Sequence, residues 1–258
     1  NQKLNLDNTK TLSLTSELTR SFIIVASKSL KELSANAGDT KITYAYLTDE
    51  KPKSSLNTAV DAFKVFTNTF GKTDKKQVTV VEAPYCFGGM EFSNLVLVTT
   101  SALNEHENFE SIIVHELAHQ WWYDIVGNNQ VTNPLLDESL TEFSTLYYYF
   151  KTQGLTTLRE LAAKNLNSHI LFLEVEKNVY DNVDESLNRT LDNFKTGGEY
   201  AQIIYTRGSL MFYNLFELMG EKKFDKALKN YFAENMYKIS EIDNLKNAFQ
   251  KSSKINLK

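Results

Sequence analysis

The chain has 258 residues, of which 42% are hydrophobic and 12% aromatic, so it can bury a large core in one or two domains. Its 32 acidic and 28 basic residues are spread along the sequence, which provides no basic stripe for nucleic acid or an anionic membrane. No apolar run approaches the roughly 20 residues that span a bilayer. The single cysteine, Cys86, excludes an intrachain disulfide and a thiolate zinc site.

The first 50 residues are predicted to form strands, because short runs alternate apolar and polar positions. These runs lie at residues 4–6, 12–14, 22–25 and 42–46. The region is too small for a complete domain, so we interpret residues 1–50 as the C-terminal part of an N-terminal β-rich domain. Residues 51–258 are predicted to form a second domain. Because the chain begins at Asn1 and not at Met, we expect a processed or excised segment. The absence of a visible signal segment therefore leaves the compartment open.

The second domain is predicted to begin with a small α/β region and to continue as helices. A composition break at residues 51–55 precedes helical spacing over 56–66, and strands are expected at 77–81 and 95–98 with a loop at 84–89. From about residue 108 the pattern is helical, with helices over 137–150, 157–177 and 200–219 and two shorter ones after them. The polar residues 181–198 are predicted to form a long exposed loop near the site.

One helical segment carries the sequence His115-Glu116-Leu117-Ala118-His119, an HExxH pattern. Residues four apart on a helix lie above one another on one face, so the two histidines can bind a single metal ion. Zinc is the natural candidate for such ligands. Glu116 follows the first histidine and can take a proton from a zinc-bound water, which makes it a general base and not a ligand.

A third ligand is predicted at Glu138, which lies 19 positions after His119 at the start of the next predicted helix. Two antiparallel helices joined by a short loop can bring this carboxylate to the metal. The set then has three protein ligands and one open position, as in catalytic zinc sites. In the alternative interpretation, Glu138 occupies the first turn of its helix because the helix dipole favours an acidic residue there.

Three motifs together resemble the gluzincin metallo-aminopeptidases, the family that includes aminopeptidase N and leukotriene hydrolase. His115 to His119 followed by Glu138 is similar to the zinc signature of that family. The segment Gly88-Gly89-Met90-Glu91-Phe92 resembles its Gly-x-Met-Glu-Asn exopeptidase motif, and Tyr205-Thr206-Arg207-Gly208 resembles its Tyr-x-Lys-Gly segment. Their order and spacing agree over roughly residues 80 to 215. The resemblance implies a thermolysin-like α+β zinc peptidase domain, with a small mixed sheet and a mostly helical lobe, preceded by the end of a β-domain.

The resemblance also implies roles for the exopeptidase motif. The residue that matches Glu91 binds the free α-amine of the substrate, which restricts cleavage to the first residue. Gly88, Gly89 and Met90 belong to the same substrate-binding segment, and glycines let a peptide backbone pass close and pair as an added strand. The structural alternative is a glycine turn with a solvated Glu91.

Tyr205 matches the family tyrosine that donates a hydrogen bond to the tetrahedral intermediate, a place where negative charge develops. The alternative is a packing tyrosine whose hydroxyl is satisfied elsewhere. Three residues depart from the family pattern. Phe92 replaces an asparagine, which puts substrate anchoring in doubt; Ser139 replaces a glycine after the third ligand; and Arg207 replaces a lysine and receives no catalytic role.

These observations predict a zinc-dependent aminopeptidase that hydrolyses the N-terminal peptide bond of peptides through a zinc-activated water. The expected partners are peptides with a free N-terminus, with one zinc ion as cofactor and no nucleic acid. Two alternatives remain: an endopeptidase or epoxide hydrolase on the same zinc scaffold, and a non-catalytic peptide-binding domain. The preferred first residue and the oligomeric state do not follow from the sequence.

Overall fold

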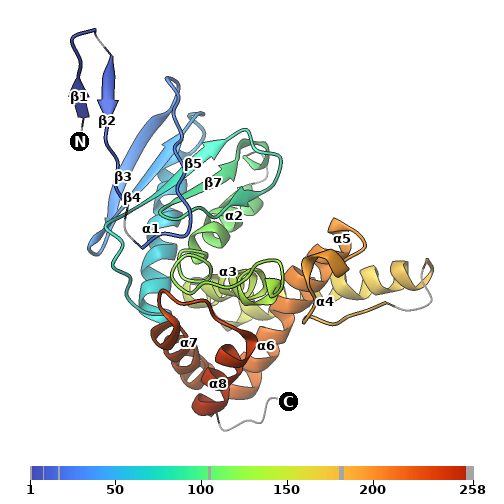
Figure 1. The fold of residues 1–258 in the computed structure, drawn as a ribbon. Helices are drawn as coiled ribbons and strands as arrows, with labels where there is room; N and C mark the ends of the chain where they lie inside the picture. Colours follow the sequence, from blue (N-terminus) through green and yellow to red (C-terminus); the bar gives the residue numbers. More distant parts are fainter. Residues whose placement is uncertain (1, 8, 17, 104–105, 180–182, 254–258) are drawn as a thin grey trace.

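The computed structural model describes residues 2–7, 9–16, 18–103, 106–179 and 183–253. A mixed β-sheet with helices against it forms one part of the molecule, and a group of packed helices forms the other (Figure 1). The predicted α+β class is therefore confirmed. Within the described part of the chain, no helix has both the length and the apolar character that crossing a bilayer requires.

The main sheet has five strands in the order β3-β4-β5-β7-β6. β3 (Lys31–Ala37) and β4 (Thr40–Tyr46) form an antiparallel hairpin, and its turn contains Gly38 at a φ of 64°. β5 (Gln77–Ala83) pairs parallel with β4, and β7 (Leu95–Thr99) pairs parallel with β5. β6 (Gly89–Met90) lies at the edge, antiparallel to β7. The strands predicted at 42–46, 77–81 and 95–98 are confirmed.

The sheet continues across residue 50, where the sequence suggests a domain boundary. β3 and β4 precede that position and β5 follows it, yet Ile42 lies in register with Val78 in the same sheet. The hairpin is thus part of the sheet beside the candidate site. The assignment of residues 1–50 to a separate β-rich domain stays a prediction.

The first residues form a separate two-stranded hairpin, β1 (Gln2–Leu4) and β2 (Lys10–Leu12), which projects from the body of the molecule (Figure 1). The strand predicted at residues 22–25 is wrong, because this segment joins no sheet. Val25 instead packs against a small cluster of Ala45, Val81 and Leu97 on one face of the main sheet. The four residues 22–25 are all apolar, and Phe22 and Ile24 are exposed while residues 23 and 25 are half-buried. The segment thus packs on one side without a strand partner.

The other face of the sheet carries the main core. Its side chains alternate with those of the small cluster along each strand, as the period of a β-strand requires. α1 (Pro52–Thr69) packs on this face with the apolar positions that the sequence predicts. The buried residues that join sheet and helix are Ile42, Tyr44, Val78, Val80, Val96, Val98, Leu56, Ala59, Val60, Phe63 and Phe66.

The remaining elements are mainly helices. They are α2 (His106–Ala118), α3 (Glu138–Gln153), α4 (Leu155–Lys177), α5 (Gly197–Tyr200), α6 (Gly208–Met219), α7 (Glu221–Asn235) and α8 (Ile242–Ser253), with short 3₁₀ turns at Thr100–Ala102, Pro134–Leu136 and Leu191–Asn193. α3 packs against α2, α4 and α6 and so lies at the centre of this lobe. The helix predicted over 200–219 is interrupted, because residues Ala201–Arg207 form a π-helical segment.

Two tryptophans fix the end of α2, where the HExxH pattern lies. Trp121 and Trp122 are fully buried, and their indole N–H groups donate to the Gly71 carbonyl at 2.9 Å and to Ser144 Oγ at 3.0 Å. The first partner follows α1 and the second belongs to α3. The C-terminal end of α2 is therefore held between two other helices, which fixes the place of its polar side chains.

Candidate active site

His115, His119 and Glu138 converge at the junction of α2 and α3. His115 lies in the last turn of α2, and His119, one turn later, directly follows its last residue. Glu138 is the first residue of α3, where the Asp137 carboxylate accepts its backbone N–H at 2.9 Å. His115 Nε2 lies 3.3 Å from His119 Nε2. Glu138 Oε2 lies 3.4 Å from each of these nitrogens. Helix periodicity and the start of α3 thus bring the three predicted ligands to one point.

This triangle has the size of a tetrahedral zinc site. Ligand atoms about 2.0–2.1 Å from a tetrahedral centre lie roughly 3.3–3.4 Å from one another, which matches the three separations observed. Glu138 Oε2 is buried and has no hydrogen-bond partner in the structure. A buried carboxylate oxygen without a partner is costly. The donor set, its spacing and this oxygen all fit a zinc ion.

The ring nitrogens that face away from the triangle are also engaged. His115 Nδ1 lies 3.1 Å from Glu142 Oε2, one helical turn after Glu138 on α3. His119 Nδ1 lies 2.9 Å from the Trp122 carbonyl and 3.2 Å from Thr141 Oγ1. Such contacts fix the tautomer of a metal-binding histidine and leave its Nε2 available as ligand. Glu142, one turn after Glu138 on α3, thus lies against His115.

Burial and charge act against each other at these ligands. Burial lowers the pKa of His119, but the charge of Glu138, a hydrogen bond with Glu138 and the charge of Glu91 together outweigh it and raise the pKa to about 9. The pKa of His115 is also raised well above its usual range, because contacts with Glu138 and Glu142 overcome burial. Conversely, burial raises the pKa of Glu138, but the charge of His119 and contacts with both histidines hold it well below its usual range. The Glu138 carboxylate and the two imidazole rings thus favour each other's charged forms.

Glu116 is nearly fully buried beside the triangle, and its Oε2 has no hydrogen-bond partner. Burial raises its pKa to about 8, while the charges of His115 and His119 act in the opposite direction. A carboxyl group with a pKa near neutrality can take up and release a proton at working pH. The position and the electrostatics of Glu116 suit the general base that the motif predicts.

The edge strand β6 passes directly over Glu116. A Cβ atom on Gly89 would lie 2.3 Å from Glu116 Oε1, so only glycine fits at this position. Side chains alternate along the strand, which turns Met90 away from the metal residues and Glu91 towards them. Glu91 is buried, and the ligand atoms of Glu91, Glu116 and His119 all lie within 4.8 Å of one another. A Cβ atom on Gly88 would lie 3.7 Å from Ile112 Cδ1, which is an ordinary van der Waals contact.

Phe92, which stands where the family motif has an asparagine, points away from the metal site. Its side chain packs with Met90 against the small cluster on the far face of the sheet, so it does not enter the metal site. Its backbone carbonyl accepts a hydrogen bond from Gln120 Nε2 at 3.1 Å, and Gln120 Oε1 accepts the Asn94 amide at 2.9 Å. Gln120 is fully buried and follows His119 directly. It therefore ties the exopeptidase motif to the metal helix.

Tyr205 reaches the site from the π-helical segment Ala201–Arg207. Its ring stacks on that of His115, with centroids 5.8 Å apart and planes at 14°. Burial raises the pKa of its phenol above the usual range, and the charge of Glu138 acts in the same direction. The phenol therefore keeps its proton and can donate it in a hydrogen bond. π-helical turns are often found at functional sites, and this one sets the direction of Tyr205.

Ser139 links the third ligand to the π-helical segment. Its Oγ donates to the Ile204 carbonyl at 2.5 Å, one residue before Tyr205. Gly208 packs so closely that a Cβ atom there would lie 2.1 Å from Ser139 Oγ. The serine that departs from the family pattern is thus fully buried and hydrogen-bonded. It joins α3 to the element that carries Tyr205.

The loop predicted at 181–198 is exposed or half-buried at every described residue except Arg189; residues 181 and 182 lie outside the described residues. Arg189 Nη1 contacts Glu199 Oε1 at 3.0 Å, and both side chains are buried. Leu191 lies in a 3₁₀ turn, and its amide donates to the Val131 carbonyl at 2.7 Å. The buried ion pair and the Leu191 hydrogen bond hold this polar segment against α5 and the loop before α3.

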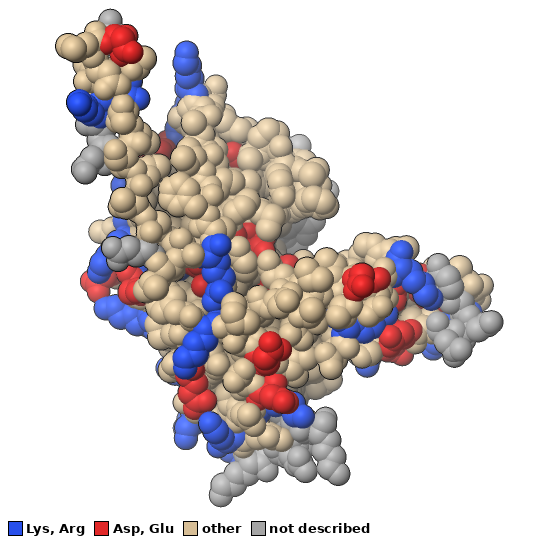
Figure 2. Space-filling view, viewed as in Figure 1, with Lys and Arg blue, Asp and Glu red and all other residues tan. Residues whose placement is uncertain are grey.

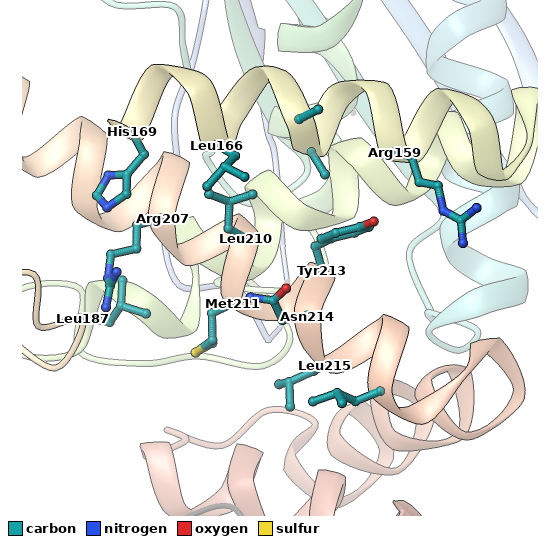
Figure 3. Close-up of a pocket in the computed structure, with 13 residues that line it drawn as sticks. Arg159, Leu166, His169, Leu187, Arg207, Leu210, Met211, Tyr213, Asn214 and Leu215 are labelled. Atoms are coloured by element: carbon teal, nitrogen blue, oxygen red, sulfur yellow. The ribbon is translucent and has the colours of Figure 1, made fainter. Parts of the chain in front are cut away.

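On the face shown in Figure 2, acidic and basic side chains are both scattered among other residues, in line with the balanced composition. A cavity of about 580 Å³ lies between α4 and α6, where Leu166, His169 and Leu210 line it (Figure 3). None of the predicted site residues lines this cavity. Among the described residues, both groups of histidine and acidic side chains close enough to share a metal lie at the site of His119.

The mixed sheet, the helical lobe and the His-His-Glu triangle define the class of the protein, a gluzincin-type metallopeptidase domain. The model of the peptidase family M1 domain matches residues 54–258. The chain therefore belongs to peptidase family M1. This confirms the family that the three sequence motifs predict.

Two leucine aminopeptidases that are similar to the chain agree with this family assignment. Leucine aminopeptidase 2-1 of Meyerozyma guilliermondii is 26% identical over 171 residues, which cover 64% of this chain and 27% of that protein. Leucine aminopeptidase 2 of Yarrowia lipolytica is 26% identical over 175 residues, or 64% and 26% of the two chains. The chain thus spans about a quarter of the length of these relatives.

A solved structure confirms the fold. The M1 zinc metallopeptidase of Deinococcus radiodurans matches with a TM-score of 0.68 at 18% identity, over 86% of this chain and 48% of that one. The predicted peptidase fold, a small mixed sheet with a mostly helical lobe, is therefore confirmed.

Proposed function

We propose that this chain forms the catalytic part of a zinc-dependent aminopeptidase that hydrolyses the first peptide bond of peptides with a free N-terminus. The observation that carries the proposal is the buried Glu91 carboxylate, whose oxygen lies within 4.8 Å of ligand atoms of Glu116 and His119. A buried anion beside a hydrolytic site suits a substrate ammonium group. Membership of peptidase family M1 supports the same activity.

His115, His119 and Glu138 are the proposed zinc ligands. Bound zinc supplies a Lewis acid that polarises the scissile carbonyl and lowers the pKa of a water molecule. Glu142 and the Trp122 carbonyl hold the two imidazole rings in orientation through Nδ1. The ligand spacing of 3.3–3.4 Å supports this assignment.

Glu116 is the proposed general base. Its carboxylate accepts a proton from the water as the water oxygen forms a bond to the carbonyl carbon of the first residue. The same proton then passes to the leaving nitrogen, the carbon–nitrogen bond breaks, and a free amino acid and a shortened peptide result. The pKa of about 8 suits a group that both takes and gives this proton.

Tyr205 and the exopeptidase motif complete the proposed site. The Tyr205 phenol donates a hydrogen bond to the carbonyl oxygen as negative charge develops on it. Glu91 binds the substrate ammonium and so sets the distance from the N-terminus to the bond that is cut. The edge of the sheet offers backbone groups of Gly88, Gly89 and Met90 to an extended peptide. The Met90 side chain leaves this side free, because it packs on the other face of the sheet.

Replacement of Glu116 by glutamine tests this proposal. We expect Glu116→Gln to bind one zinc ion and to lose nearly all hydrolysis of leucine amide, because the amide cannot accept the proton. Glu110→Gln, on the same helix α2, is the matched control and should stay active. Full activity of Glu116→Gln would overturn the mechanism.

The same assay separates the two alternative functions. Hydrolysis of N-acetylated peptides at rates comparable to free peptides would favour an endopeptidase, since Glu91 has no part in binding an acetylated end. Peptide binding without turnover by the zinc-loaded protein would favour a non-catalytic domain. The proposal predicts hydrolysis of the free peptide alone.

A further inference from the structure

The carboxylate of Glu91 accepts a hydrogen bond from a residue that no motif contains. Gln130 Nε2 donates to Glu91 Oε1 at 2.8 Å. Gln130 lies 39 positions later in the chain, in the loop between α2 and α3. This loop therefore contributes a donor to the site at the point where the substrate amine is proposed to bind.

The chemistry of this donor matters because Glu91 stands in a crowded acidic region. The negative charges of Glu91 and Glu138 both act on Glu116 and raise its pKa, although burial is the larger cause. A lysine or arginine at position 130 would orient Glu91 but would also neutralise it. A glutamine amide orients the carboxylate by a hydrogen bond and leaves its net charge available for a cation.

The loop that carries Gln130 is held at several points. Asn129 Oδ1 accepts the backbone amides of Val131 and Thr132 at 3.1 and 3.2 Å. The Val131 carbonyl accepts the amide of Leu191 at 2.7 Å, which ties the loop to the segment before α5. The base of the loop is fixed as well, because Gly127 exchanges backbone hydrogen bonds with residues 238 and 240. Gln130 is thus presented from a fixed position.

From these contacts we propose that Gln130 is a positioning residue for recognition of the substrate amine. It holds one oxygen of Glu91 in place and directs the other towards the ammonium group of the first residue. The inference rests on the proposed function, because it assigns Gln130 to the amine-binding step of that reaction. A residue that acts only in this step affects ligands with a free amine and spares ligands without one.

The test compares Gln130→Met with the wild type. Methionine has nearly the same length but cannot donate to Glu91. A hydrogen bond to a charged group contributes enough that its loss should raise KM for leucine amide about 10- to 100-fold. We expect kcat to change much less. The inhibition constant of 4-methylpentanamide, the analogue of leucine amide without the amine, should stay unchanged.

Controls separate positioning from folding. Gln153→Met, at the exposed end of α3, should match the wild type in KM. If Gln130→Met melts at a much lower temperature, Gln130→Asn replaces it, since its amide is one methylene too short to reach Glu91. An unchanged KM, or equal losses for ligands with and without the amine, would overturn the inference. A wild-type protein that does not hydrolyse leucine amide would instead overturn the proposed function.

Discussion

Two buried polar clusters lie at opposite ends of the 119–124 segment, and they differ in how completely their groups are paired. In the first, Asp124 accepts hydrogen bonds from Lys75 Nζ and from Ser93 Oγ, the latter at 2.5 Å. Lys75 also donates to Asn94 Oδ1 at 2.8 Å. The side chains of Lys75 and Asp124 are 6% and 1% exposed, and their charges cancel. This pairing is what a buried structural ion pair requires.

The cluster around His119 has the opposite character. It gathers three acidic side chains, Glu91, Glu116 and Glu138, beside two histidines. Buried oxygens of Glu116 and Glu138 have no hydrogen-bond partner. The first cluster is paired as it stands, whereas the second has the charge and the unpaired oxygens that suit the proposed zinc ion and substrate amine. The number of unpaired buried oxygens therefore distinguishes the structural cluster from the site where chemistry is proposed.

The largest effect on stability is expected when the paired cluster loses one partner. Lys75→Met leaves Asp124 buried without its counter-ion, which should lower the free energy of unfolding by about 3–5 kcal/mol. Urea denaturation measures this loss. Lys72→Met, whose partner Asp39 is exposed, is the control and should change stability little. Zinc binding by folded Lys75→Met should match the wild type; a change in zinc affinity would mean that the clusters are not independent.

Removal of the Tyr205 hydroxyl should act on the second cluster alone. Tyr205→Phe keeps the ring stacked on His115 but cannot donate a hydrogen bond to the oxyanion, so kcat should fall about 100- to 1,000-fold. The melting temperature and the zinc content should stay close to those of the wild type. Steady-state kinetics with leucine amide provide the measurement, and an unchanged kcat would remove Tyr205 from the mechanism.

A smaller effect is expected at the edge of the metal cluster. Glu142→Gln weakens the contact that orients His115, and the loss of such an outer partner typically costs about 10- to 100-fold in metal affinity. Competition with a zinc chelator measures the affinity. Glu160→Gln, an exposed substitution on α4, serves as control. An affinity equal to the wild type would mean that Glu142 does not orient His115.

The sequence predicts the zinc triangle because its geometry is mostly local. His115 and His119 share a helix face by periodicity alone, and Glu138 opens the next helix at a spacing typical of the family. The direction of Phe92 also follows from strand alternation, once Gly89 is known to face Glu116. Such features depend on neighbours in the chain.

Other contacts depend on how distant segments meet, and the sequence does not reveal them. Gln130 reaches Glu91 across 39 positions through a loop whose path is set by contacts with residues 191 and 238–240. The π-helical turn before Gly208 and the sheet register of Ile42 with Val78 likewise result from packing. Apart from its place after His119, nothing in the sequence indicates a role for Gln120. In the structure, its side-chain amide hydrogen-bonds the backbone of Phe92 and Asn94, at the end of the exopeptidase motif.

One assay of the zinc-loaded wild-type protein decides whether the chain is a zinc aminopeptidase, with metal content and hydrolysis measured on the same sample. Leucine amide and N-acetyl-leucine amide are the two substrates. We predict one zinc ion per chain and hydrolysis of leucine amide alone, because Glu91 binds only a free ammonium group. Absence of bound zinc, or equal hydrolysis of the acetylated substrate, would contradict the account.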